Sequence, residues 1–198
     1  MANEVNKIKF GLTNVYYAVA EIAADGTAEY ETPVRWMGAV SIDLSPEGDN
    51  VVFYADNIEY WVGNGNNGYS GDLEIARVID SFRTDILGDV VDAKGVTFEN
   101  TEAPIKHFAL LFEFSGDVKH TRHVFYNCTA TRPSSAGQTK GESIEPSTET
   151  VTITAKTIYN DTLDKWVPKA STNEDTDSTI YEGWFDAVYQ GTAPITTP

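Results

Sequence analysis

The stretch GDNVVFYADNIEYWVGNGNNGYSGDLEIARVIDSFRTDILG, residues 48–88, decides the fold class. It contains two aromatic runs with the composition of strands, a turn region rich in glycine and asparagine, a strictly alternating run and one short helical segment. In the alternating run, Leu73 and Ile75 alternate with Asp72 and Glu74, which predicts a strand with one buried face and one acidic, solvated face. The stretch therefore predicts strands with little helix.

The helical segment lies between two capping signals. Asp80 or Ser81 can accept hydrogen bonds from the first free amides of a helix, and Gly88 suits its left-handed end. The apolar residues between these signals fall three and four positions apart: Ile79, Phe82 and Ile86. This spacing predicts a short helix that docks on a sheet through one apolar stripe.

Residues 63–68, GNGNNG, match the G-x-G-x-x-G pattern of dinucleotide-binding proteins. That pattern works only when a helix follows, because the N-terminal amides of the helix bind the pyrophosphate. Here residues 69–75 follow, and they have the two-residue period of a strand and carry two carboxylates that repel phosphate. Asparagine and glycine are also the residues that left-handed turn positions favour, so we interpret the string as a turn.

The rest of the chain continues this pattern of short strands and turns. Residues 15–22 are apolar on both faces, which predicts a strand covered on two sides. Residues 105–114 and 119–130 predict the longest hairpin, with its first arm at the centre of a sheet, and residues 184–189 predict a last short strand. The fold class predicted is mainly β: an antiparallel β-sandwich or barrel-like unit with one short flanking α-helix.

Length and composition fit a single domain over residues 1–198, with a flexible tail at 192–198. Apolar residues make up 41% of the chain, but the longest apolar run, residues 15–20, is too short for a membrane helix. The first residues lack the apolar segment of a secretory signal, so we expect a chain that starts out in a cytoplasm. A net charge of −16 without a basic cluster argues against tight binding of nucleic acid.

The reactive residues do not form a pattern typical of an enzyme. His120 and His123 are three apart, so on a strand they point to opposite faces and cannot bind one metal ion together, and His107 is remote. Cys128 lies in a strand-like run and is interpreted as a small buried hydrophobe. Acidic residues are so numerous that a chance pair is no evidence for hydrolysis, and no G-x-S-x-G is present. The sequence predicts no catalytic residues, metal or cofactor.

One alternative from another functional class rests on aromatic side chains. Tyr54, Tyr60, Trp61 and Tyr69 lie close together in the sequence and could form a platform on which sugars stack. They would make the chain a carbohydrate-binding β-sandwich for adsorption to a host. Alternating aromatic residues more often lie in cores and cross-strand pairs, so this remains the second interpretation.

Several longer segments carry a resemblance to a known family. They are residues 53–57 (FYADN), 66–74 (NNGYSGDLE), 80–85 (DSFRTD), 106–113 (KHFALLFE), 126–133 (YNCTATRP) and 142–146 (ESIEP). These segments resemble the major tail proteins, or tail tube proteins, of long-tailed, non-contractile bacteriophages of Gram-positive hosts. The similarity runs in order over nearly the whole chain, from about Lys7 to Tyr189.

The resemblance implies a tail-tube fold, a β-sandwich with a flanking helix, that assembles into hexameric rings stacked as a hollow tube. It implies that hairpins join neighbouring subunits into an inner barrel, that long loops bridge rings, and that DNA passes through the lumen without specific binding. The implied partners are further copies of the chain and the tape measure, tail terminator and distal tail proteins. The implied location is the tail of the virion, after synthesis and assembly in the cytoplasm of the bacterial host.

Two groups of residues are candidates for roles in such a tube. Asp72 and Glu74 are candidates for a lumen-facing acidic surface, although they are equally compatible with ordinary solvated positions on the outside of a sheet. The polar segment 131–147, broken by proline and glycine, is a candidate contact with a neighbouring subunit or ring. Its candidate contact residues are Gln138, Lys140, Glu142 and Ile144.

Overall fold

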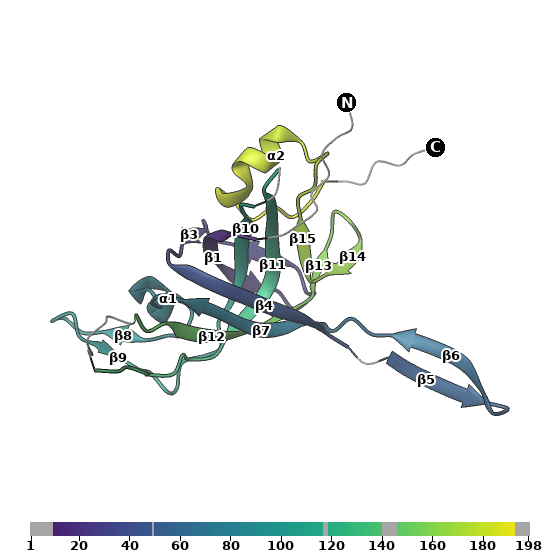
Figure 1. Ribbon diagram of the computed structural model, residues 1–198, viewed down its shortest axis with the longest axis horizontal. Helices are drawn as coiled ribbons and strands as arrows, with labels where there is room; N and C mark the ends of the chain where they lie inside the picture. The colour runs from purple at the N-terminus through teal and green to yellow at the C-terminus, as the bar shows by residue number, and fades with distance from the viewer. Residues whose placement is uncertain (1–9, 49, 117–118, 140–145, 193–198) are drawn as a thin grey trace.

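The computed structural model describes residues 10–48, 50–116, 119–139 and 146–192. Nine antiparallel strands form its main sheet (Figure 1). The path of the sheet runs through β2 (Ala28–Tyr30), β1 (Leu12–Ile22), β10 (His107–Phe114), β11 (Thr121–Ala130), β12 (Glu149–Lys156), β7 (Gly68–Ile75) and β4 (Ala39–Glu47). Two short strands complete it: β3 (Val34–Arg35) pairs with β1, and β15 (Lys169–Ser171) pairs with β11. The predicted mainly β, antiparallel fold is confirmed.

Strand β11 divides this sheet into two layers. Residues 123–125 in its first half pair with β15, whereas residues 127–130 in its second half pair with β12. Strands β12, β7 and β4 therefore leave the plane of β1, β10 and β11, and Figure 1 shows them running across the direction of β10 and β11. The result is sandwich-like, and the described strands do not close into a barrel.

The main core lies between these layers. Leu73 and Ile75 of β7 and Val151 and Ile153 of β12 are fully buried, as their alternation with polar residues predicts. Helix α1 (Asp80–Asp85) contributes Phe82, whose ring contacts three other core rings. Its centroid lies 4.2 Å from that of Trp36, 5.1 Å from that of Tyr17 and 5.4 Å from that of Phe108. The predicted stripe of the helix therefore anchors it.

A second core covers the opposite face of β1, β10 and β11. Its sheet residues include Ala18, Ala109, Leu111, Val124 and Tyr126. They are covered by the hairpin of β13 (Ile158–Asn160) and β14 (Lys165–Val167), by α2 (Ser178–Glu182) and by a 3-10 helix (Gly183–Phe185). Apolar side chains thus cover both faces of β1 and β10. The central position predicted for the strand at residues 105–114 is confirmed.

The strand predicted over residues 184–189 is wrong. This segment covers a sheet face: its first residues belong to a 3-10 helix, and the Tyr189 carbonyl accepts a hydrogen bond from the Tyr126 side chain rather than from a strand backbone. Asp177 caps α2 by accepting a hydrogen bond from the Thr179 amide at 2.8 Å, and the Asp186 amide donates to the Gly183 carbonyl at 3.0 Å. The helical turns bury Trp184, which is 2% exposed.

The capping of α1 also differs from the prediction at one end. Ile79 occupies the N-cap position, without a side-chain hydrogen bond, so neither Asp80 nor Ser81 caps the helix. Nearby, Glu149 of β12 accepts a hydrogen bond from the Val78 amide at 2.5 Å. At the other end, Gly88 has a φ of 73°, which confirms its predicted left-handed conformation.

Besides the β13–β14 hairpin, two further hairpins stand outside the main sheet. The first is formed by β5 (Asn50–Ala55) and β6 (Ile58–Asn64), and it turns at Asp56 and Asn57, whose φ angles are 52° and 62°. We call it the arm, because it projects from one end of the molecule in Figure 1. The second is formed by β8 (Val90–Val91) and β9 (Thr97–Phe98), and it lies at the opposite end.

Within the described residues, no helix is long and apolar enough to span a membrane.

The buried ring of Phe82 gives a test of the main core. Its replacement by alanine is expected to lower the free energy of unfolding by about 3–5 kcal/mol, because it leaves a cavity between α1 and the sheet. The matched control is Phe98→Ala, since Phe98 is 55% exposed. This change is expected to alter stability by about 0.5 kcal/mol or less in dilute protein. Urea unfolding measures both, and equal losses would contradict the core assignment.

Candidate functional site

An acidic surface covers the outside of β4, β7 and β12. Because alternate residues of these strands point into the core, the others carry hydroxyl and carboxylate groups outward. The register places Asp43 opposite Asp72 and Ser41 opposite Glu74. We call the four carboxylates of these two strands the acidic face: Asp43, Glu47, Asp72 and Glu74. The single basic residue at the outward positions of the three strands is Lys156, at the end of β12.

Hydroxyl groups on or beside the neighbouring strands hold Asp72 and Glu74. Thr152 donates a hydrogen bond to Asp72 at 2.7 Å. Glu74 accepts hydrogen bonds from Thr148 at 2.6 Å and from Ser41 at 3.0 Å. These two bonds, that from Thr148 first, lower the pKa of Glu74 from its ordinary 4.5, because they stabilise the charged form. The carboxylate of Glu74 is therefore ionised at neutral pH.

Within the described residues, no ion pair neutralises the acidic face. Asp72 is exposed and Glu74 is half-buried, in agreement with the predicted wet side of this strand. Sequence reasoning missed Asp43 and Glu47 as members of this face, because only the pairing of β4 with β7 brings them beside Asp72 and Glu74.

The second predicted contact region is the segment 131–147, which connects β11 to β12. Its described residues form neither helix nor strand, and Gln138 is exposed. Lys140, Glu142 and Ile144 lie outside the described residues. The assignment of this segment to an inter-subunit or inter-ring contact therefore stays a prediction.

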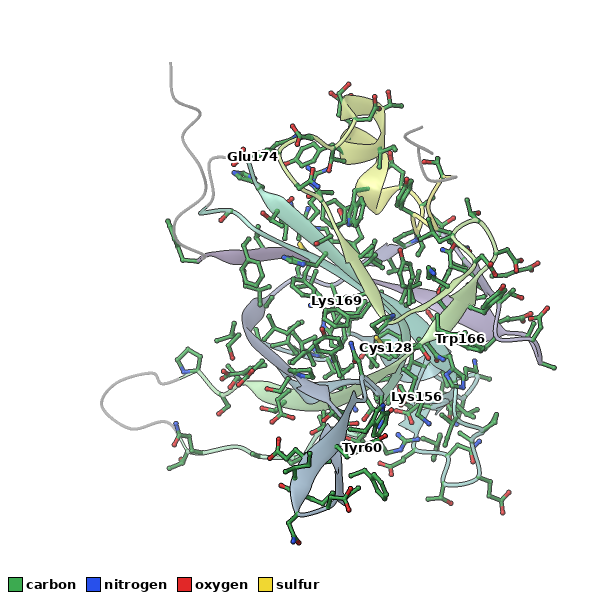
Figure 2. The ribbon with its side chains drawn as sticks, turned by 90° about the vertical axis from the view of Figure 1, so that its right-hand side faces the viewer. Tyr60, Cys128, Lys156, Trp166, Lys169 and Glu174 are labelled. Carbon is green, nitrogen blue, oxygen red and sulfur yellow. The ribbon has the colours of Figure 1, made fainter. Side chains whose placement is uncertain are left out.

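The four aromatic residues considered for sugar binding do not share one surface. Tyr54, Tyr60 and Trp61 are 57–70% exposed on the arm, which projects from the body in Figure 1 and carries the labelled Tyr60 in Figure 2. Tyr69 instead packs against the main core, with its ring centroid 5.2 Å from that of Phe125. Lys169 lies over the Tyr69 ring at 4.5 Å. The predicted sugar-stacking platform is thus split between the arm and the body.

The string at 63–68 connects two strands, as the rejection of a nucleotide site predicts. Strand β6 ends at Asn64 and β7 begins at Gly68, so no helix follows to bind a pyrophosphate. Two of the glycines serve close packing. The Trp61 ring lies over Gly63, and a side chain at Gly68 would meet the backbone carbonyl of Ala155. The interpretation of all these glycines as turn residues is therefore too simple.

The three histidines have separate environments. The His107 ring lies 2.7 Å from the Asn127 side-chain oxygen, His123 stacks on the ring of Phe112, and the His120 ring lies 3.8 Å from Glu113. The described residues contain no group of three His, Cys, Asp or Glu side chains able to hold a metal ion.

Cys128 is fully buried, and burial raises the pKa of its thiol. Its interpretation as a small core residue is confirmed.

Sequence reasoning missed two ion pairs in which the carboxylate is buried. Arg122 of β11 donates to Glu113 of β10 at 2.9 Å, and the Glu113 side chain is 5% exposed. Arg132 lies 2.5 Å from Asp89, whose side chain is 4% exposed. The register of the β10–β11 hairpin pairs Glu113 with Arg122, so that contact had a signal in the predicted hairpin. The pair of Arg132 and Asp89, 43 residues apart, had none.

Comparison with known proteins gives one family. A protein-family model described as phage tail tube protein matches residues 1–193. No curated protein matches the sequence.

The hydroxyl groups around Glu74 give a pH test. Replacing Thr148 by valine is expected to raise the pKa of Glu74 toward 4.5, because the largest stabilising bond is lost. The control, Thr152→Val, removes the bond to Asp72 instead and is expected to leave the pKa of Glu74 unchanged. Carboxyl NMR titration measures both, and a Glu74 pKa unaffected by Thr148→Val would contradict the assignment.

The lowered pKa of Glu74 also makes the stability of the fold depend on pH, in a direction that can be stated. A lowered folded-state pKa contributes stability that is present above the ordinary pKa and is lost as the pH falls from 4.5 through the folded value. The Thr148→Val variant is expected to lose less stability than the parent over this pH range. Urea unfolding at a series of pH values measures the difference.

Proposed function

The chain belongs to the phage tail tube protein family, and we propose that it assembles into stacked hexameric rings that form the conduit for DNA ejection. The observation that carries the role as a conduit is the acidic face, a row of carboxylates that take part in no ion pair among the described residues. In this proposal the role is structural, and no side chain performs catalysis.

The acidic face lines the bore in this proposal. Binding to DNA depends on cationic groups that neutralise phosphates, so a wall of carboxylates gives the moving DNA nothing to adhere to. Salt limits the repulsion to roughly 8 Å from the wall at physiological ionic strength, a distance that matters in a narrow bore. The threonine and serine hydroxyls between the carboxylates keep the wall hydrated without adding positive charge.

The ends of the main sheet supply the joints of a ring. The path of the sheet ends at β4 on one side and at β2 on the other. An open strand edge is an aggregation liability for a free subunit, but in a ring it pairs with the next subunit. Joining neighbours at β4 would continue the layer of β12, β7 and β4 around the bore and place the acidic face of each subunit beside that of the next.

Other parts of the tail complete the proposal. We place the segment 131–147 at a contact with the neighbouring subunit or ring. The tape measure, tail terminator and distal tail proteins are the partners that a tube of this family requires, after synthesis and assembly in the host cytoplasm. The carbohydrate-binding alternative has less support, because Tyr69 lies apart from the exposed aromatic residues of the arm.

Chemical labelling tests whether the acidic face lines the bore. In an Asp72→Cys variant, a small maleimide is expected to react in both free subunits and tubes, whereas a large polyethylene glycol maleimide reacts only in free subunits. The control is Glu182→Cys, at an exposed position of α2, which is expected to accept the large reagent in both states because α2 covers a different part of the sheet from the acidic face. Because Cys128 is fully buried, it does not interfere. Full reaction of Asp72→Cys with the large reagent in tubes would overturn the assignment.

Deleting residues 138–144 tests the connecting segment. The domain is expected to remain folded, because the described part of this segment contributes no strand or helix to either core. Tube growth is expected to stop, because the deletion removes the proposed contact. Circular dichroism measures folding and negative-stain electron microscopy measures tube length. Tubes of normal length would disprove the role of this segment.

A further inference from the structure

The β8–β9 hairpin presents apolar side chains to solvent at one end of the molecule. Val90, Val91, Val96 and Phe98 are 48–55% exposed, and the nearby Ile105 is 79% exposed. Val90 and Val91 are neighbours on one strand, so their side chains point to opposite faces, and both faces are in water. An isolated two-stranded hairpin is marginally stable at best, and this one has only two residues in each strand.

Arg132 supplies the order that these strands lack. Its guanidinium lies 2.5 Å from the Asp89 carboxylate and donates to the Leu87 carbonyl at 2.8 Å, both just before β8. The same guanidinium donates to the Asn100 carbonyl at 3.1 Å and lies 3.4 Å from the Glu99 carboxylate, both just after β9. One side chain therefore joins the two ends of the hairpin.

This clamp is expensive in free energy. The Asp89 side chain is 4% exposed and the Arg132 side chain 29% exposed, so the carboxylate is withdrawn from water while the guanidinium keeps partial access to it. A charge pair with a buried member seldom stabilises a fold more than apolar residues would. Here the pair of Arg132 and Asp89 holds the β8–β9 hairpin in place, although the exposed apolar side chains of this hairpin belong to neither core. An ordered apolar surface of this kind is typical of an interaction site.

The arm presents exposed aromatic side chains at the opposite end of the molecule. Phe53, Tyr54, Tyr60 and Trp61 are 57–70% exposed, and the arm pairs its two strands only with each other. Figure 1 places the arm and the β8–β9 hairpin at opposite ends of the longest axis, so the two cannot meet within one chain. Aromatic and β-branched residues form favourable cross-strand pairs, and the β8–β9 hairpin supplies the valines.

We infer that Arg132 holds the β8–β9 hairpin as a preformed docking surface for the β5–β6 arm of a second copy of this chain. The occupant is a second copy because the chain belongs to a family that forms a tail tube. A contact between different surfaces at opposite ends of identical subunits repeats from copy to copy, as a continuous assembly requires. The inference rests on the proposed assembly and adds the residues that meet.

Disulfide crosslinking between two singly substituted proteins tests the contact. Tyr60→Cys protein is mixed with Val91→Cys protein under assembly conditions and oxidised, and a mixed dimer is expected in high yield. The control replaces Val91→Cys by Asp186→Cys, an exposed position after the 3-10 helix, and is expected to give several-fold less mixed dimer. Tubes that form with no more mixed dimer than the control would overturn this inference and leave the proposed tube intact. Absence of any ring or tube would refute both.

Two further variants test the surface and its clamp on the Tyr60→Cys and Val91→Cys pair. Phe98→Ser alters an exposed side chain, so the subunit is expected to fold and the crosslink to fall several-fold. Arg132→Gln is expected to speed hydrogen exchange over residues 89–100 and to lower the crosslink similarly, while amides of β10 stay protected. The matched control is Arg77→Gln, which loses only an exposed ion pair with Asp80. An unchanged crosslink in Phe98→Ser, or unchanged exchange in Arg132→Gln, would contradict the inference.

Discussion

The division of one strand edge between two partners determines the architecture. Strand β11 pairs with β10 along one edge, and its other edge is shared by β15 and β12. Each partner takes one half, so the sheet splits at the middle of β11 and β12 leads away into a second layer. Both layers then cover the main core, and the outward side of β12, β7 and β4 becomes the acidic face. The split also leaves the outer face of β10 and β11 to be covered by the C-terminal segments.

The sequence was sufficient for the local features of this fold. Alternation in residues 72–75 and the apolar stripe of α1 predicted which side chains are buried, because both depend on the geometry of a single element. The strand predicted at 184–189 failed for a physical reason, since this segment covers a sheet face instead of lying along a strand edge. The split at β11 was also beyond prediction, because it depends on which distant strand, β12 or β15, occupies each half of an edge.

In the candidate site, too, the sequence predicted the residues of one strand but not those that a second strand brings beside them. Asp72 and Glu74 were found because they alternate with buried residues on one strand, whereas Asp43 and Glu47 required the register of a separate strand. The exposure of the arm was not predicted, because its aromatic residues have the composition of a core strand. Arg132 gave no signal at all, since its partners lie 32 to 45 residues away in a region without periodicity.

The distribution of charge connects the fold to the proposed conduit. The chain has 14 basic residues against 30 acidic ones, and three of its arginines form ion pairs with at least one buried or half-buried partner. Arg83 binds Glu149, Arg122 binds Glu113 and Arg132 binds Asp89, and each pair joins two separate elements. None of these three cations lies on β4 or β7, and no ion pair of the described residues involves the four carboxylates of the acidic face. The excess of acidic residues, with no described ion pair at the acidic face, thus leaves this side of the sheet with the negative charge that the proposed conduit uses.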